Sequence, residues 1–108
     1  MFGSEFITNL LVDLVFMFYD GKIFDVAKRL QELGCKDVLA TSDGIVLTGL
    51  VGGMRVGIPR GLDPINTLVQ ISFSLFGPYW PFCYNSKEAF RIVRNKWRER
   101  IKESKGEK

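Results

Sequence analysis

Six basic side chains near the end of the chain recur at spacings that suit a helical ridge. They lie three or four residues apart, which places them on one face of a helix: Lys87, Arg91, Arg94, Arg98, Lys102 and Lys105. A ridge of cations can follow the phosphates of a nucleic acid, because this attraction needs clustered charge and no particular base sequence. We therefore predict a nucleic-acid-binding surface here. The alternative is a solvated helix face on which Glu99 and Glu103 offset part of the charge.

The positive charge of the chain is concentrated in this last segment. Residues 87–108 carry nine Lys or Arg and four Glu, a balance of +5, whereas residues 1–86 carry six basic and eight acidic side chains, a balance of −2. The total of +3 thus combines a basic C-terminal segment with a weakly acidic body. Segregated charge of this kind indicates an acidic partner without identifying it.

The residues that most catalytic and metal sites require are missing or scattered. The sequence has no histidine, which removes the commonest general base and the commonest metal ligand. Its aspartates are spread over expected helix surfaces and turns, and no nucleophile has a base visible in the sequence. We predict a non-catalytic binding module with no catalytic residue, no metal and no cofactor.

The two cysteines, Cys35 and Cys83, are too few for a tetrahedral zinc site, and their spacing matches no redox motif. We predict two buried free thiols, with a disulfide between them as the alternative.

An apolar run over residues 6–19 is the only stretch that resembles a membrane segment. Its fourteen residues, interrupted by Asp13, fall short of the roughly 20 needed to span a bilayer, and no signal-peptide features surround it. We therefore expect a cytoplasmic protein. Residues 3–6, Gly-Ser-Glu-Phe, match translated cloning sites, so we assign no function to residues 1–6.

The apolar pattern predicts a single α+β domain over residues 1–104, followed by a frayed tail at 105–108. Two helices come first. Residues 7–18 form one, because Glu5, Asn9 and Asp13 recur every four positions as a polar stripe, although a buried strand over residues 11–19 is the alternative. The second covers residues 23–33 and ends at Gly34.

A four-stranded antiparallel sheet is expected next. Hairpin turns at Asp43-Gly44 and Gly52-Gly53 predict a three-stranded meander over residues 37–58. Strict alternation of apolar and polar residues predicts a fourth strand over residues 67–76, with at most a short helical turn before it at Asp63-Pro64.

A C-terminal amphipathic basic helix is expected over residues 86–104. Asn85 can cap its first turn, and Glu88, three residues later, can complete a capping box. The apolar stripe contains Ala89, Phe90, Val93, Trp97 and Ile101. We expect Trp97 to lie in the core and to seal this helix onto the sheet.

Two further surfaces are candidates for interactions. The aromatic turn at residues 78–82 can display Tyr79 and Trp80, or it can fold their rings back over the core. The first helix is so apolar that two neighbouring elements would leave part of it in water, which predicts a homo-oligomer with Leu10, Leu14 and Met17 at its interface. The rival function is therefore a homodimeric protein-interaction or chaperone-like adaptor. Peripheral membrane attachment ranks third.

Overall fold

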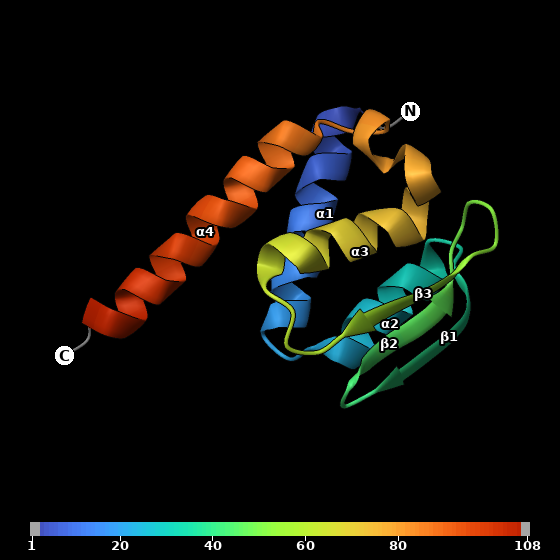
Figure 1. Cartoon of the computed structure of the whole chain (residues 1–108), viewed down its shortest axis with the longest axis horizontal. Helices are drawn as coiled ribbons and strands as arrows, with labels where there is room; N and C mark the ends of the chain where they lie inside the picture. The colour runs from blue at the N-terminus through green and yellow to red at the C-terminus, as the bar shows by residue number, and fades with distance from the viewer. Residues whose placement is uncertain (1–2, 107–108) are drawn as a thin grey trace.

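Helices cover one face of a three-stranded antiparallel sheet (Figure 1). The computed structural model describes residues 3–106. In chain order the elements are α1 (Ser4–Tyr19), α2 (Ile23–Glu32), β1 (Lys36–Thr41), β2 (Gly44–Thr48), β3 (Arg55–Pro59), α3 (Pro64–Phe76), the 3-10 helix η1 (Gly77–Phe82) and α4 (Ser86–Gly106). The predicted α+β class is confirmed, and the first element is a helix and not a strand.

The sheet has the predicted meander order β1-β2-β3, but residues 49–54 connect β2 to β3, so the predicted two-residue turn at Gly52-Gly53 is wrong. In the first hairpin Thr41 pairs with Gly44, so the two-residue turn is Ser42-Asp43, one position before the turn that the sequence predicts. Gly44 has a φ of +140°, and a Cβ there would lie 2.3 Å from the carbonyl oxygen of Ile58 on the neighbouring strand. A glycine is therefore required where β2 begins.

The predicted fourth strand is wrong, because all of residues 67–76 belong to helix α3. Asp63 caps this helix by accepting the backbone N–H of Asn66 at 2.8 Å, and Pro64 occupies its first turn. The alternation misled because two of its three polar positions, Ser72 and Ser74, are fully buried, whereas the third, Gln70, is half-buried. Each has a partner: Ser74 donates to the carbonyl oxygen of Gln70 at 2.9 Å, and Ser72 shares a hydrogen bond of 2.7 Å with the Tyr84 hydroxyl.

Helix α1 lies at the centre of the helical layer. It packs against α2, α3 and α4, and Leu11, Leu14 and Val15 are at most 1% exposed. The predicted oligomer depended on α1 having two covering neighbours, whereas α1 has three. The exposed positions of the helix include its polar stripe of Glu5, Asn9 and Asp13, as predicted.

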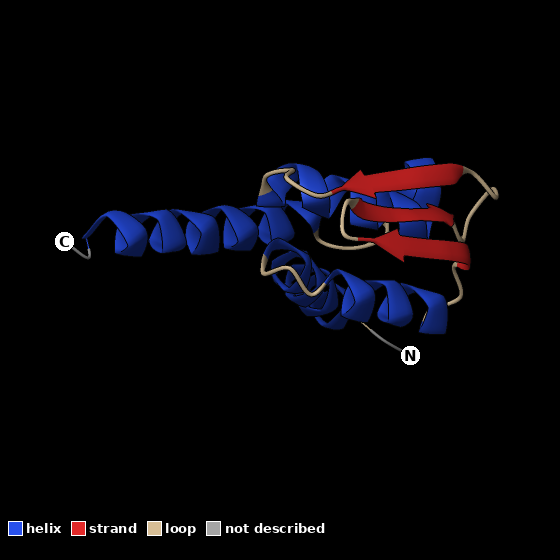
Figure 2. Cartoon of the chain, turned by 90° about the horizontal axis from the view of Figure 1, so that it is seen from below, coloured by secondary structure: helices blue, strands red, loops and turns tan. Residues whose placement is uncertain are grey.

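Helices α2 and α3 pack on the sheet, against Ile45, Leu47, Val56 and Ile58 of the core. Helix α4 packs instead on α1 and α3, and its far end extends past the rest of the molecule (Figures 1 and 2). Trp97 therefore does not seal α4 onto the sheet, and it is half-buried. The helix continues to Gly106, two residues beyond the predicted end, and residues 107–108 of the predicted tail lie outside the described part.

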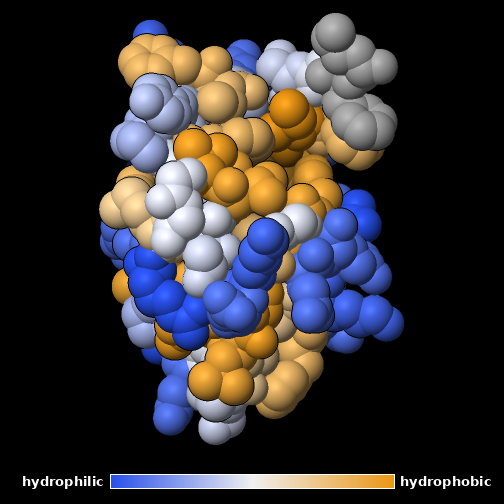
Figure 3. Space-filling model, turned by 90° about the vertical axis from the view of Figure 1, so that its right-hand side faces the viewer, coloured by the Kyte–Doolittle hydropathy of each residue, from blue (hydrophilic) through white to orange (hydrophobic). Residues whose placement is uncertain are grey.

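Several apolar side chains remain exposed. Figure 3 shows them gathered on the side of the molecule opposite the free end of α4. Phe6 is 46% exposed at the start of α1, and Leu50 is 49% exposed in the connection between β2 and β3. That connection is fixed to α3, since the Leu50 N–H donates to the carbonyl oxygen of Ser74 at 2.9 Å.

Substitution of two neighbouring α3 residues tests the helical assignment. Ile71→Ala should lower the free energy of unfolding by about 2–5 kcal/mol, because this side chain is fully buried. Val69→Ala should cost clearly less, because Val69 is half-buried and alanine is the better helix former. Both are measured by urea unfolding. Equal losses would contradict the helix, since a strand buries both residues on one face.

Candidate nucleic-acid interface

Buried apolar side chains anchor only the first half of α4. Asn85 caps the helix by accepting the backbone N–H of Glu88 at 3.1 Å, which confirms the predicted cap. Ala89 and Val93 are fully buried against the other helices, and the Phe90 ring meets the Trp80 ring edge to face at 5.8 Å. From Arg98 to Gly106 every residue is exposed, so α4 presents this length to any partner.

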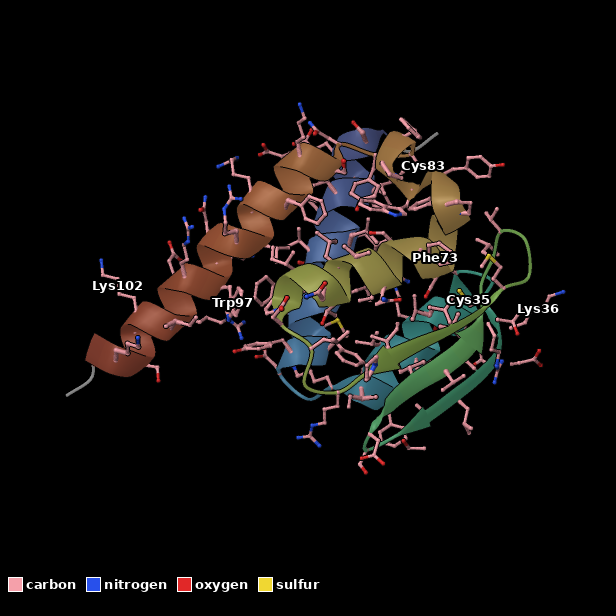
Figure 4. The ribbon with its side chains drawn as sticks, viewed as in Figure 1. Cys35, Lys36, Phe73, Cys83, Trp97 and Lys102 are labelled. Carbon is pink, nitrogen blue, oxygen red and sulfur yellow. The ribbon has the colours of Figure 1, made fainter. Side chains whose placement is uncertain are left out.

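The six predicted ridge residues lie together on the exposed side of α4. All of Lys87, Arg91, Arg94, Arg98, Lys102 and Lys105 are exposed. At about 100° per residue they fall within an arc of about 80°, and at about 1.5 Å per residue the ridge is about 27 Å long. Figure 4 shows Lys102 pointing away from the domain and Trp97 pointing toward α3, so the basic and apolar faces are separated.

One ridge cation is already paired. Arg91 donates two hydrogen bonds to the Glu88 carboxylate, one of them from Nε to Oε1 at 3.1 Å. These hydrogen bonds lower the pKa of Glu88, since they favour its charged form. In the described part of the chain no ion pair involves the other five ridge residues. Their charge is therefore available to a partner.

The acidic residues of α4 do not interrupt the ridge. Glu99 and Glu103 lie roughly 100–140° around the helix from the centre of the ridge, at 100° per residue. They offset the net charge of the helix but lie outside the arc of the ridge, where Glu88 neutralises Arg91 alone among the described side chains.

A second set of cations, on the inner flank of α4, fixes the helix to α1. Arg100 donates to both carboxylate oxygens of Asp20, and its guanidinium lies over the Phe16 ring, 4.7 Å from the centroid, and near the Tyr19 ring at 5.8 Å. Lys96 also lies over Phe16, at 5.8 Å. These contacts combine an ion pair with cation–π attraction. Sequence reasoning missed them because the partners are 80 residues apart.

The two aromatic candidates have different environments. Tyr79 is 61% exposed, whereas Trp80 is half-buried and its ring packs near those of Tyr84 and Phe90. The turn therefore displays one ring and folds the other back over the core. Neither aromatic residue belongs to α4, so they do not extend the basic ridge.

The three residues predicted to form a dimer interface also differ in their exposure to solvent. Leu14 is 1% exposed within one chain, which makes it a core residue and corrects its assignment to a surface. Leu10 and Met17 are half-buried and remain accessible.

Both cysteines are free thiols, which excludes the disulfide alternative in this structure. Cys35 is buried, and burial raises its pKa. Cys83 is exposed, contrary to the prediction, because it lies in the turn between η1 and α4.

Within residues 3–106 no group of three or more acidic or cysteine side chains is placed to hold a metal ion. No described helix has both the length and the apolar character needed to cross a membrane. No protein-family model matches the chain, and comparisons with curated proteins and with solved structures gave no significant match. Function must therefore be inferred from the side chains described above.

Removal of the contacts that Arg100 makes with α1 should lower the stability of the protein measurably. Arg100→Ala should lower the free energy of unfolding by about 1 kcal/mol, because it removes a solvent-exposed ion pair and two contacts with aromatic rings. Arg98→Ala, a matched change on the ridge face, should change it by less than about 0.5 kcal/mol. Urea unfolding of both variants measures the difference. Equal effects would show that Arg100 does not anchor α4.

Proposed function

We propose that the protein is a non-catalytic module that binds nucleic acid through the basic ridge of α4. One observation carries the proposal: five ridge cations that form no ion pair within residues 3–106 share a narrow, exposed face of one helix, and that helix extends past the domain. Such a face can contact several phosphates at once without first breaking contacts within the protein. Attraction of this kind is independent of base sequence.

The charge of the rest of the protein, residues 1–86, favours an interface that is confined to α4. Its net charge is −2, and two of its arginines already bond to backbone carbonyl oxygens. Arg55 donates to that of Asp37 at 3.1 Å, and Arg60 donates to that of Ser42 at 3.3 Å. These hydrogen bonds leave both charges unneutralised, but the body as a whole is acidic and should repel phosphates, so phosphate contacts should be confined to α4.

A salt series tests this proposal directly. Wild-type protein should shift duplex and single-stranded oligonucleotides in a gel at low salt, and its affinity should fall steeply as salt increases. Arg94→Ala combined with Arg98→Ala should weaken binding and reduce the slope of log affinity against log salt by roughly 2, about one for each phosphate that the variant no longer neutralises. Folding should be retained, since both side chains are exposed.

A matched variant separates ridge contacts from a change in net charge. Lys28→Ala combined with Lys36→Ala also removes two exposed cations, one on α2 and one on β1. This variant should keep the wild-type salt slope. If the two double variants behave alike, or if wild-type protein fails to bind at low salt, the ridge is only a solvated helix face and the proposal is wrong.

A further inference from the structure

Two aromatic side chains of the 3-10 helix η1 are exposed to solvent. Phe82 is 87% exposed, more than any other large apolar side chain of residues 3–106, and Tyr79 is 61% exposed. Residues three apart in a 3-10 helix lie one above the other, about 6 Å apart at about 2.0 Å per residue. Tyr79 and Phe82 therefore share one face of η1, and we refer to them as the aromatic pair.

A different side of η1 fixes the aromatic pair to the domain. The Trp80 ring packs 6.4 Å from the Tyr84 ring and 5.8 Å from the Phe90 ring. The Cys83 N–H donates to the carbonyl oxygen of Trp80 at 3.2 Å, and the Cys83 thiol donates to that of Tyr79 at 3.2 Å. Two prolines within η1 restrict its backbone further. A backbone held in this way loses little conformational freedom when a ligand binds the pair.

The two rings of the aromatic pair are not used within the protein. Among the described residues, neither ring contacts another aromatic ring, and no cation lies over either of them. Their exposed surface is therefore available to a ligand. Every nucleobase has a π face, so stacking of bases on such rings is independent of base sequence, as is the attraction of phosphates to the basic ridge.

The aromatic pair is no part of α4, but it lies next to the start of the ridge. Helix η1 packs against α4, and Figure 4 shows Cys83, which follows the pair, on the side of the molecule where α4 begins. Phe82 precedes Lys87, the first ridge residue, by five positions, so their Cα atoms are at most about 17 Å apart. No acidic residue lies between them in the sequence. A strand whose phosphates follow the ridge can therefore reach the pair with its bases.

We propose that the aromatic pair stacks unpaired bases of a single-stranded nucleic acid whose phosphates lie along the ridge. This inference rests on the proposed function and adds a class of substrate to it, since the ridge alone attracts duplexes and single strands alike. In a duplex the faces of the bases are covered by their neighbours in the stack, so only unpaired bases can use the pair. The pair therefore adds affinity for single strands that a duplex does not gain.

Fluorescence anisotropy with a labelled oligothymidine of about 16 nucleotides tests the stacking. Tyr79→Ala combined with Phe82→Ala should weaken binding about fivefold to a hundredfold, as expected for the loss of base–aromatic stacking. The line of log affinity against log salt should move down without a change of slope, because stacking releases no counterions. Arg94→Ala combined with Arg98→Ala should change the slope instead, so the two contributions are measured separately.

Two control variants isolate the rings. Phe24→Ala combined with Leu39→Ala removes exposed apolar side chains of similar exposure, 64% on α2 and 59% on β1, and should bind oligothymidine like wild-type protein. Tyr79→Phe combined with Phe82→Tyr keeps both rings and should also bind like wild type. All four positions are exposed, so each variant should keep the wild-type circular dichroism spectrum and melting transition.

Two control ligands isolate the bases. An abasic strand of the same length keeps the phosphates but lacks the bases, and a duplex hides them. The variant with both rings changed to alanine should bind these two ligands as tightly as wild-type protein does. Equal binding of oligothymidine by wild type and this variant, or equal weakening with all three ligands, would overturn the stacking and leave the ridge proposal intact. Failure of wild-type protein to bind any of the three at low salt would instead contradict the proposed function, and the stacking with it.

Discussion

Burial of α1 among three other helices is the constraint on which the rest of the structure depends. Its side chains are apolar around most of the circumference, and only a thin polar stripe tolerates water. At about 25 cal/mol per Å² of apolar surface, exposing such a helix would cost a large part of the net free energy of unfolding of a small domain. Helices α2, α3 and α4 must therefore pack around it, and the sheet covers α2 and α3 from the other side.

This arrangement explains why buried apolar side chains anchor α4 only through its first half. Helices α2 and α3 already cover part of α1, so α4 needs to contribute only a short apolar surface, centred on Ala89 and Val93. The remaining turns have no core to cover. They can carry charge at little cost to stability, which is why a long basic helix is compatible with this fold.

Local signals in the sequence were sufficient for helices α1, α2 and α4, for the strand order of the meander and for the basic ridge, although several ends were misplaced by one to three residues. The ridge follows from spacing alone once residues 86–104 form a helix, and the Asn85 cap is a contact over three residues. The α3 prediction failed because two of its three polar positions, Ser72 and Ser74, are buried serines, and the Tyr84 partner of Ser72 is not visible as a local pattern. The predicted position of Trp97 failed for a related reason, since sequence does not show whether a helix packs on a sheet or on other helices.

The positive residues of α4 thus perform two physical roles that net charge does not distinguish. On the inner flank, Lys96 and Arg100 lie over the aromatic rings of α1, where partial desolvation strengthens the attraction and their charge is used within the protein. On the outer flank, Arg94, Arg98 and Lys102 are exposed to water and keep their charge for a partner. Successive residues are about 100° apart around a helix, so residues two positions apart lie on nearly opposite sides. The cations at every second position from Arg94 to Lys102 therefore alternate between the outer and inner flanks of α4. The same helix can therefore be held at a fixed angle to α1 by one flank while the other remains open to binding.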